Sequence, residues 1–104
     1  MFVSLDSSGA VVLSEPDNFR ELYVDAGGRD LQALDRALVA GDAGRLVDGY
    51  AWLYRDFLEA VLAAAGAGWQ PRFEGMFDFA RTRDWTGSEN DRETFRAHVV
   101  SAAR

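Results

Sequence analysis

The chain of 104 residues contains no cysteine and no lysine. Without cysteine it can form neither disulfide bonds nor a thiolate zinc site, and this usage fits a reducing compartment. Its longest apolar stretch, residues 60–67, is far shorter than the ~20 residues that a membrane-spanning helix requires. The first residues show neither the basic region nor the apolar core of a secretory signal. We therefore expect a cytoplasmic protein that does not enter a membrane.

Positive charge is also scarce, because 11 arginines face 17 aspartates and glutamates and leave a net charge of −6. Phosphate binding depends on clustered basic side chains that release counterions. The composition therefore disfavours nucleic acid as a partner. A partner attracted by charge should instead be basic.

Motifs that carry chemistry are missing as well. The sequence has no GxSxG nucleophile elbow, no phosphate-binding loop and no EF-hand loop. Carboxylates recur at helical spacing, but the ExxH motif of di-metal bundles is absent, so we predict no metal and no cofactor. The only histidine, His98, is a weak candidate for acid–base catalysis, and a boundary residue on a helix is the simpler interpretation.

What is present predicts a mainly α protein. Two short apolar runs around a polar turn with glycine predict a β-hairpin in residues 1–14. The remaining residues, 15–104, show mostly helical periodicity. The predicted helices cover residues 14–26, 30–40, 45–65 and 70–84, and a last one begins near residue 90. We therefore expect a single domain, residues 1–104, in which the hairpin precedes a compact bundle of about five helices.

Trp52 does not fit the apolar face of the predicted helix 45–65. Eight apolar residues of that segment fall on one face at 100° per residue, whereas Trp52 projects on the opposite side. Its neighbours there are charged: Asp48, Arg55, Asp56 and Glu59. Because tryptophan is enriched at binding hot spots, the pattern predicts a non-enzymatic interaction protein that binds itself or another protein around Trp52. The alternative is that another element covers Trp52 and makes this helix central.

An acidic row follows the predicted helix 14–26. Asp17, Glu21 and Asp25 lie four residues apart, so their like charges repel on a helix. One interpretation is an acidic ridge that meets a basic partner. The other is a solvated helix face.

Four aromatic residues recur at helical spacing on the two longest predicted helices. They are Tyr50, Tyr54, Phe73 and Phe77. These side chains would fill the space between the helices as packed core, or line an aromatic pocket beside His98. The pocket supports an alternative function, a small-molecule-binding protein or a minor enzyme.

The end of the chain predicts a final helix. Asn90 followed by Glu93 resembles a capping box, and Phe95, Val99 and Ala102 would face the core. The arginines of this segment make it the only faint candidate for a DNA recognition helix, which its own acidic residues oppose.

Overall fold

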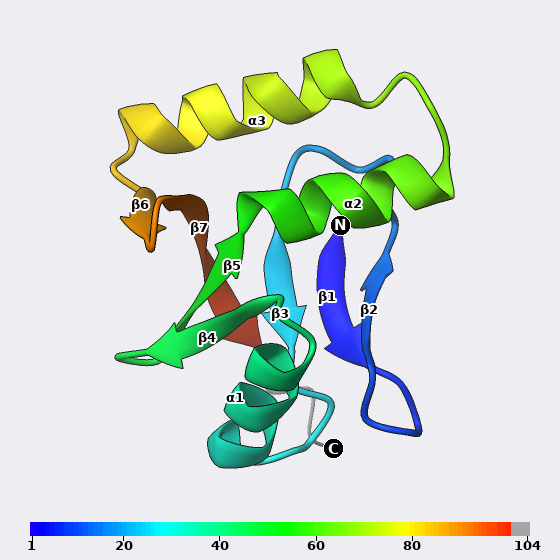
Figure 1. Ribbon diagram of the computed structural model, residues 1–104, viewed down its shortest axis with the longest axis vertical. Coiled ribbons are helices and arrows are strands. Elements are labelled where there is room, and N and C mark those ends of the chain that lie inside the picture. Colours follow the sequence, from blue (N-terminus) through cyan, green and yellow to red (C-terminus); the bar gives the residue numbers. More distant parts are fainter. Residues whose placement is uncertain (101–104) are drawn as a thin grey trace.

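The protein is a curled sheet with three helices, as the computed structural model of residues 1–100 shows (Figure 1). The elements in chain order are β1 (Phe2–Leu5), β2 (Val11–Ser14), β3 (Tyr23–Asp25), α1 (Leu31–Ala40), β4 (Gly44–Val47), β5 (Tyr50–Tyr54), α2 (Arg55–Ala65), α3 (Gln70–Thr82), β6 (Thr86–Glu89) and β7 (Arg92–Val100). The expected bundle of about five helices is therefore wrong. None of α1, α2 and α3 is long and apolar enough to cross a bilayer.

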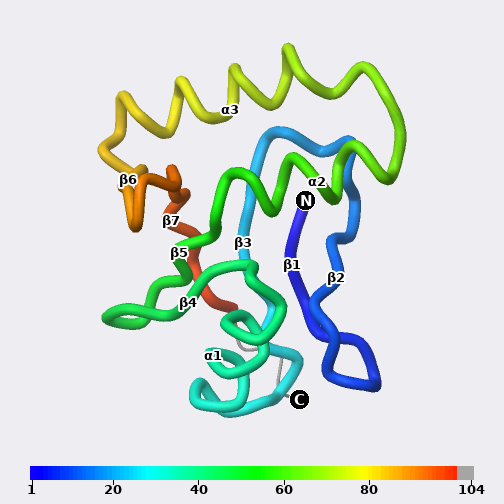
Figure 2. Tube along the Cα trace, viewed as in Figure 1, coloured from blue at the N-terminus to red at the C-terminus, as the bar shows by residue number. Residues whose placement is uncertain are grey.

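The seven strands form one mixed sheet in the order β2-β1-β3-β7-β5-β4, with β6 also paired to β7. The pairs β1–β3 and β3–β7 are parallel, and the others are antiparallel. The Cα trace shows β1 and β7, from opposite ends of the chain, on either side of β3 (Figure 2). The sheet curls into a half-barrel, so one of its faces is concave.

The core lies between this concave face and the helices. Successive side chains of a strand point to opposite faces, and the inward set includes Val3, Val24 and Leu53, which are fully buried. Leu34 and Leu38 of α1, and two leucines of α2, complete the same cluster. Each buried leucine or valine contributes about 1.5–3 kcal/mol relative to an exposed one.

Three predicted elements are confirmed. The hairpin exists as β1 and β2, and the carboxylate of Asp6 closes its turn by accepting hydrogen bonds from the backbone of Ser8 and Ala10. Helix α1 begins after Asp30, whose side chain caps the helix by accepting from Ala33 N. Helix α3 matches the predicted helix 70–84 and ends at Thr82.

The predicted helix 45–65 is wrong over its first half. Asp48 and Gly49 have φ of 53° and 83°, and positive φ at both central residues is what a type I′ hairpin turn requires. The chain therefore folds back as β4 and β5, and a helix starts only at Arg55. An Asp-Gly pair between apolar runs is a strong hairpin signal that the helical periodicity of these residues obscured.

The first and last predicted helices are also wrong. Residues 15–22 form a loop that leads into β3. Asn90 and Asp91 have φ of 51° and 63°, so they form a turn between β6 and β7 instead of a helix cap. Phe95 is buried and Val99 partly buried as strand residues, while Ala102 lies outside the described residues.

Candidate functional site

The sheet has a gap along one edge of β7. On its other edge β7 pairs with β5. On the gapped edge it pairs first with β6, up to Phe95, and then with β3, from His98 onward. Between these two strands, Arg96 N donates a hydrogen bond to the carbonyl of Trp85 at 2.8 Å. The sheet is thus open where β7 passes from β6 to β3.

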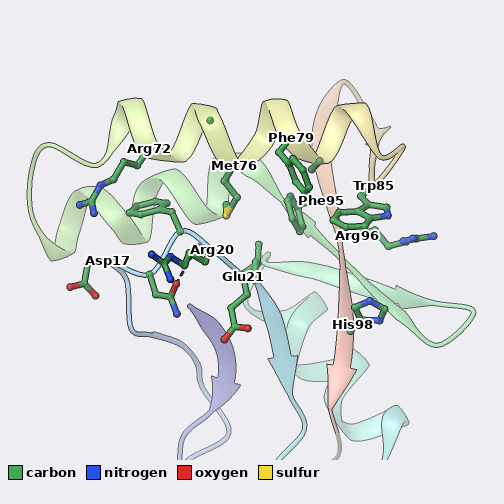
Figure 3. Close-up of a pocket in the computed structure, with 15 residues that line it drawn as sticks. Asp17, Arg20, Glu21, Arg72, Met76, Phe79, Trp85, Phe95, Arg96 and His98 are labelled. Atoms are coloured by element: carbon green, nitrogen blue, oxygen red, sulfur yellow. Dashed lines mark hydrogen bonds between the residues drawn. The ribbon is translucent and has the colours of Figure 1, made fainter.

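A cavity of ≈770 Å³ lies at this gap, bounded by α3 and the loop 17–22 (Figure 3). Helix α3 contributes Met76 and Phe79 to one wall, and the loop forms the other. Phe95 and Trp85 lie on the β6 and β7 side. We call this cavity the α3 groove.

The lining of the α3 groove is mainly apolar. Met76 and Phe79 extend from α3 toward the groove (Figure 3). Phe79 stays 52% exposed, although its ring packs edge-on against Trp85 at a centroid distance of 5.9 Å. The groove therefore presents aromatic surface that the fold itself does not cover.

Charged side chains surround the apolar lining. Arg72 Cζ lies 4.9 Å from the centroid of Phe19, and Arg96 Cζ lies 4.4 Å from that of Tyr50. Arg20 also lines the groove. Such cation–π contacts hold a guanidinium in place. The mouth of the groove thus carries three arginines, two of them positioned by aromatic rings, beside the carboxylates of Asp17 and Glu21.

The N-terminal ammonium fixes the loop wall of the groove. The Met1 ammonium donates to the carbonyls of Asn18 at 2.8 Å and Glu21 at 2.9 Å. Burial lowers the pKa of this ammonium below its usual value, although Glu21 and other nearby carboxylates oppose the change. Residues 17–22 have no helix or strand of their own, and these two hydrogen bonds therefore attach them to Met1, just before β1.

Trp52 lies on a strand and not on a helix. It is half-buried on β5 and pairs with Arg45 and Arg96 of the neighbouring strands. A Cβ atom added at Gly87 would lie 3.2 Å from its ring, so β6 partly covers the indole. The predicted helix face around Trp52 therefore does not exist.

The charged residues expected around Trp52 are placed elsewhere. Asp48 belongs to the β4–β5 turn. Arg55 and Glu59 on α2 pair with each other at 3.2 Å, and Asp56 pairs with Arg92 at 2.6 Å. One of these ion pairs therefore lies within α2, and the other links α2 to β7.

The predicted pocket residues separate onto two faces of the sheet. Tyr50 and His98 lie opposite each other on β5 and β7, with ring centroids 5.4 Å apart, on the face opposite to the buried Ala51 and Ala97. Phe73 and Phe77 are fully buried, and Phe77 packs on Phe95 at 5.2 Å. The two phenylalanines are core, and His98 is the predicted pocket residue that lines the α3 groove.

The predicted acidic ridge is also dispersed. Asp17 and Glu21 line the α3 groove from the loop, whereas Asp25 lies on β3 and accepts a hydrogen bond from Gly27 N. The predicted ridge needed a continuous helix over residues 14–26, which the loop and β3 replace. Within residues 1–100, no group of three or more His, Asp or Glu side chains is arranged to hold a metal ion.

The change of stability at alkaline pH tests the contact between Tyr54 on β5 and Glu89 on β6. Its side chain is buried and its hydroxyl donates to Glu89 Oε2 at 2.9 Å. Burial first, and then this hydrogen bond, raise the pKa of Tyr54 above 10.0. The unfolded chain therefore loses this proton first as the pH rises, and the folded protein loses stability from about pH 10 upward.

We expect Tyr54→Phe to remove part of this alkaline loss of stability. Urea unfolding, measured at intervals from roughly pH 8 to pH 11, gives the free energy of unfolding of each protein as a function of pH. The free energy of unfolding should fall less steeply in Tyr54→Phe than in the wild type above about pH 10. Equal slopes in the two proteins would mean that the folded state does not hold the Tyr54 proton.

The α3 groove combines residues that sequence patterns did not associate. Arg72 and Phe79 both belong to α3, whereas Arg20 belongs to the loop 17–22, and the fold places these two segments on opposite walls of one groove. Comparison of the chain with protein-family models, curated proteins and solved structures yields no match, so the interpretation of function starts from this groove.

Proposed function

We propose that the protein binds a small, largely apolar molecule in the α3 groove. The observation that carries this proposal is the cavity itself, at ≈770 Å³. Ligand sites typically enclose about 300–1,000 Å³, and they combine an apolar lining with a few polar groups. Both features are present here, because Met76, Phe79 and Phe95 line the cavity and arginines lie at its mouth.

The exposed surface of Phe79 supports the proposal energetically. Covering apolar surface contributes about 25 cal/mol per Å² removed from water. A ligand that covers the 52% of Phe79 that remains exposed would gain from a side chain already ordered against Trp85. Little conformational entropy is lost when such a preformed wall is used.

The protein-contact role of Trp52 stays a prediction. Trp52 lies half-buried on β5, partly covered by β6, on the same face of the sheet as Tyr50 and His98. That face meets the α3 groove at Arg96 and His98, which line the groove as well. The groove is the better-supported site because it is a cavity of suitable size.

We expect Phe79→Gln to weaken binding of the neutral dye prodan roughly tenfold, because about half of a phenylalanine's burial energy is lost. Leu31→Gln is the matched control, since Leu31 on α1 is also 52% exposed and does not line the groove. Fluorescence titration of the wild type and both variants measures the dissociation constants. Equal losses in the two variants, or no binding by the wild type, would contradict the proposal.

A further inference from the structure

Within residues 1–100, four of the seven arginines outside the α3 groove are paired with carboxylates. Arg45 pairs with Glu89 at 2.8 Å, and Arg92 pairs with Asp42 at 2.8 Å and with Asp56. Arg55 and Arg81 each contact two or more carboxylates. This is expected in a chain with a net charge of −6, where acidic partners outnumber arginines.

Among the described residues, the three arginines of the α3 groove also lack such pairs, and unlike Arg29, Arg36 and Arg83 they line a single cavity. Within residues 1–100, none of Arg20, Arg72 and Arg96 lies within 4.0 Å of a carboxylate oxygen. Acidic groups are nevertheless close in the chain, because Asp17 and Glu21 belong to the same loop as Arg20. Their side chains extend away from α3 (Figure 3). The three guanidinium groups thus outnumber the two carboxylates of the groove lining and form no ion pair with them.

Two of these arginines are also held in place by aromatic rings. Arg72 lies over Phe19 and Arg96 over Tyr50. A guanidinium that stacks on a ring by its flat face keeps donors at its edge, and its planar fork matches the oxygens of a carboxylate. Such an arrangement orders the cation before any anion arrives, which reduces the entropy lost on binding.

We propose that the ligand of the α3 groove is an amphipathic anion, a free single-chain carboxylate whose apolar body lies against Met76, Phe79 and Phe95. Its carboxylate lies at the mouth, where Arg72 and Arg20 donate to it. Charge complementarity selects this class over a neutral or cationic molecule of the same length. This assignment rests on the proposed binding function and adds the head group to it.

The test compares three probes that share one alkyl chain: decanoate, decanol and decyltrimethylammonium, each below its micelle concentration. Isothermal titration calorimetry at low salt gives the affinity of each for the full chain. We expect decanoate to bind at least tenfold more tightly than decanol, and the cation to bind most weakly. Raising the salt concentration should reduce the preference, since it screens charges at an exposed mouth.

Two variants locate the preference at the groove. Arg72→Gln and Arg20→Gln should each reduce the preference for decanoate over decanol roughly tenfold. Arg36→Gln is the control, because Arg36 lies exposed on α1 and does not line the groove. A split between the two probes is a readout that a mere loss of stability would not produce.

The outcomes separate the two proposals. A preference for decanoate that is lost in Arg72→Gln or Arg20→Gln, and kept in Arg36→Gln, supports the anion. Decanol binding as tightly as decanoate, or a preference unchanged in both groove variants, overturns the anion and leaves the apolar groove in place. Binding of neither decanoate nor decanol, together with no binding of prodan, overturns the groove as well.

Discussion

Replacement of Gly44 by alanine should unfold the protein or nearly so. Gly44 is buried at the start of β4, where its φ is 154°. An added Cβ would lie 2.1 Å from the carbonyl oxygen of Trp52 and 2.9 Å from Leu53 Cα, both backbone atoms of the paired strand. Neither atom can move without breaking the β4–β5 pairing. We expect a loss of at least about 4 kcal/mol, out of the roughly 5–15 kcal/mol that stabilises a typical domain.

Replacement of Gly75 by alanine should instead stabilise the protein. Gly75 lies within α3, and an added Cβ meets no atom within 4 Å. Alanine is favoured over glycine by about 0.5–1 kcal/mol inside a helix, so Gly75→Ala should raise the melting temperature by several degrees. Thermal unfolding by circular dichroism compares both variants with the wild type. A melting temperature for Gly44→Ala close to that of the wild type would show that β4 and β5 do not approach so closely.

Local capping and turn signals predicted the elements that depend on neighbouring residues alone. Asp30 and Gly41 mark the two ends of α1, and Gly9 in the polar turn marks the first hairpin. Asp48 and Gly49 carry the same kind of turn signal. The helical periodicity outweighs it, because the apolar residues of β4, β5 and α2 also fit the spacing of a single helix. In addition, no loop separates β5 from α2.

The last strand shows a second limit of periodicity. From Phe95 to Val99 the sequence alternates apolar and polar residues, and in the structure Phe95 and Ala97 are buried while His98 is exposed. That period of two indicates a strand. A possible helix cap at Asn90 favoured the helix instead, whereas the positive φ of Asn90 and Asp91 belongs to a turn.

The candidate site was less predictable than the helices. His98 was identified because it is the only histidine, and it does line the α3 groove. Arg20, Arg72 and Arg96 carry no local signal, since an arginine without a carboxylate partner is recognised only when the fold shows which acids are near it. The groove arises from parallel pairing of β3 with β7, a contact between residues more than 70 positions apart. Sequence spacing does not encode such a contact directly.

Loss of Arg55 should be the most damaging change to a side chain on the protein's surface. Its guanidinium bonds Glu59 and Glu93, each at 3.2 Å, and also contacts Glu74. The side chain is only 17% exposed, and Arg55 Cζ lies 5.0 Å from the centroid of Phe77. It therefore joins α2, α3 and β7 while covering the aromatic core beneath α3.

We expect Arg55→Met to lower the free energy of unfolding by about 2–3 kcal/mol, between the values for buried and exposed ion pairs, because three carboxylates lose their shared cation. The melting temperature should fall by roughly 10–20 °C for a domain of this size. Arg36→Met on α1 is the control and should stay within about 0.5 kcal/mol of the wild type. Adding Glu74→Gln to Arg55→Met should recover part of the loss, since Glu74 has no other arginine partner within residues 1–100 and one repelling charge is removed. If Arg55→Met and Arg36→Met melt together, the three glutamates do not depend on Arg55, and packing of Phe73 and Phe77 alone holds α3 in place.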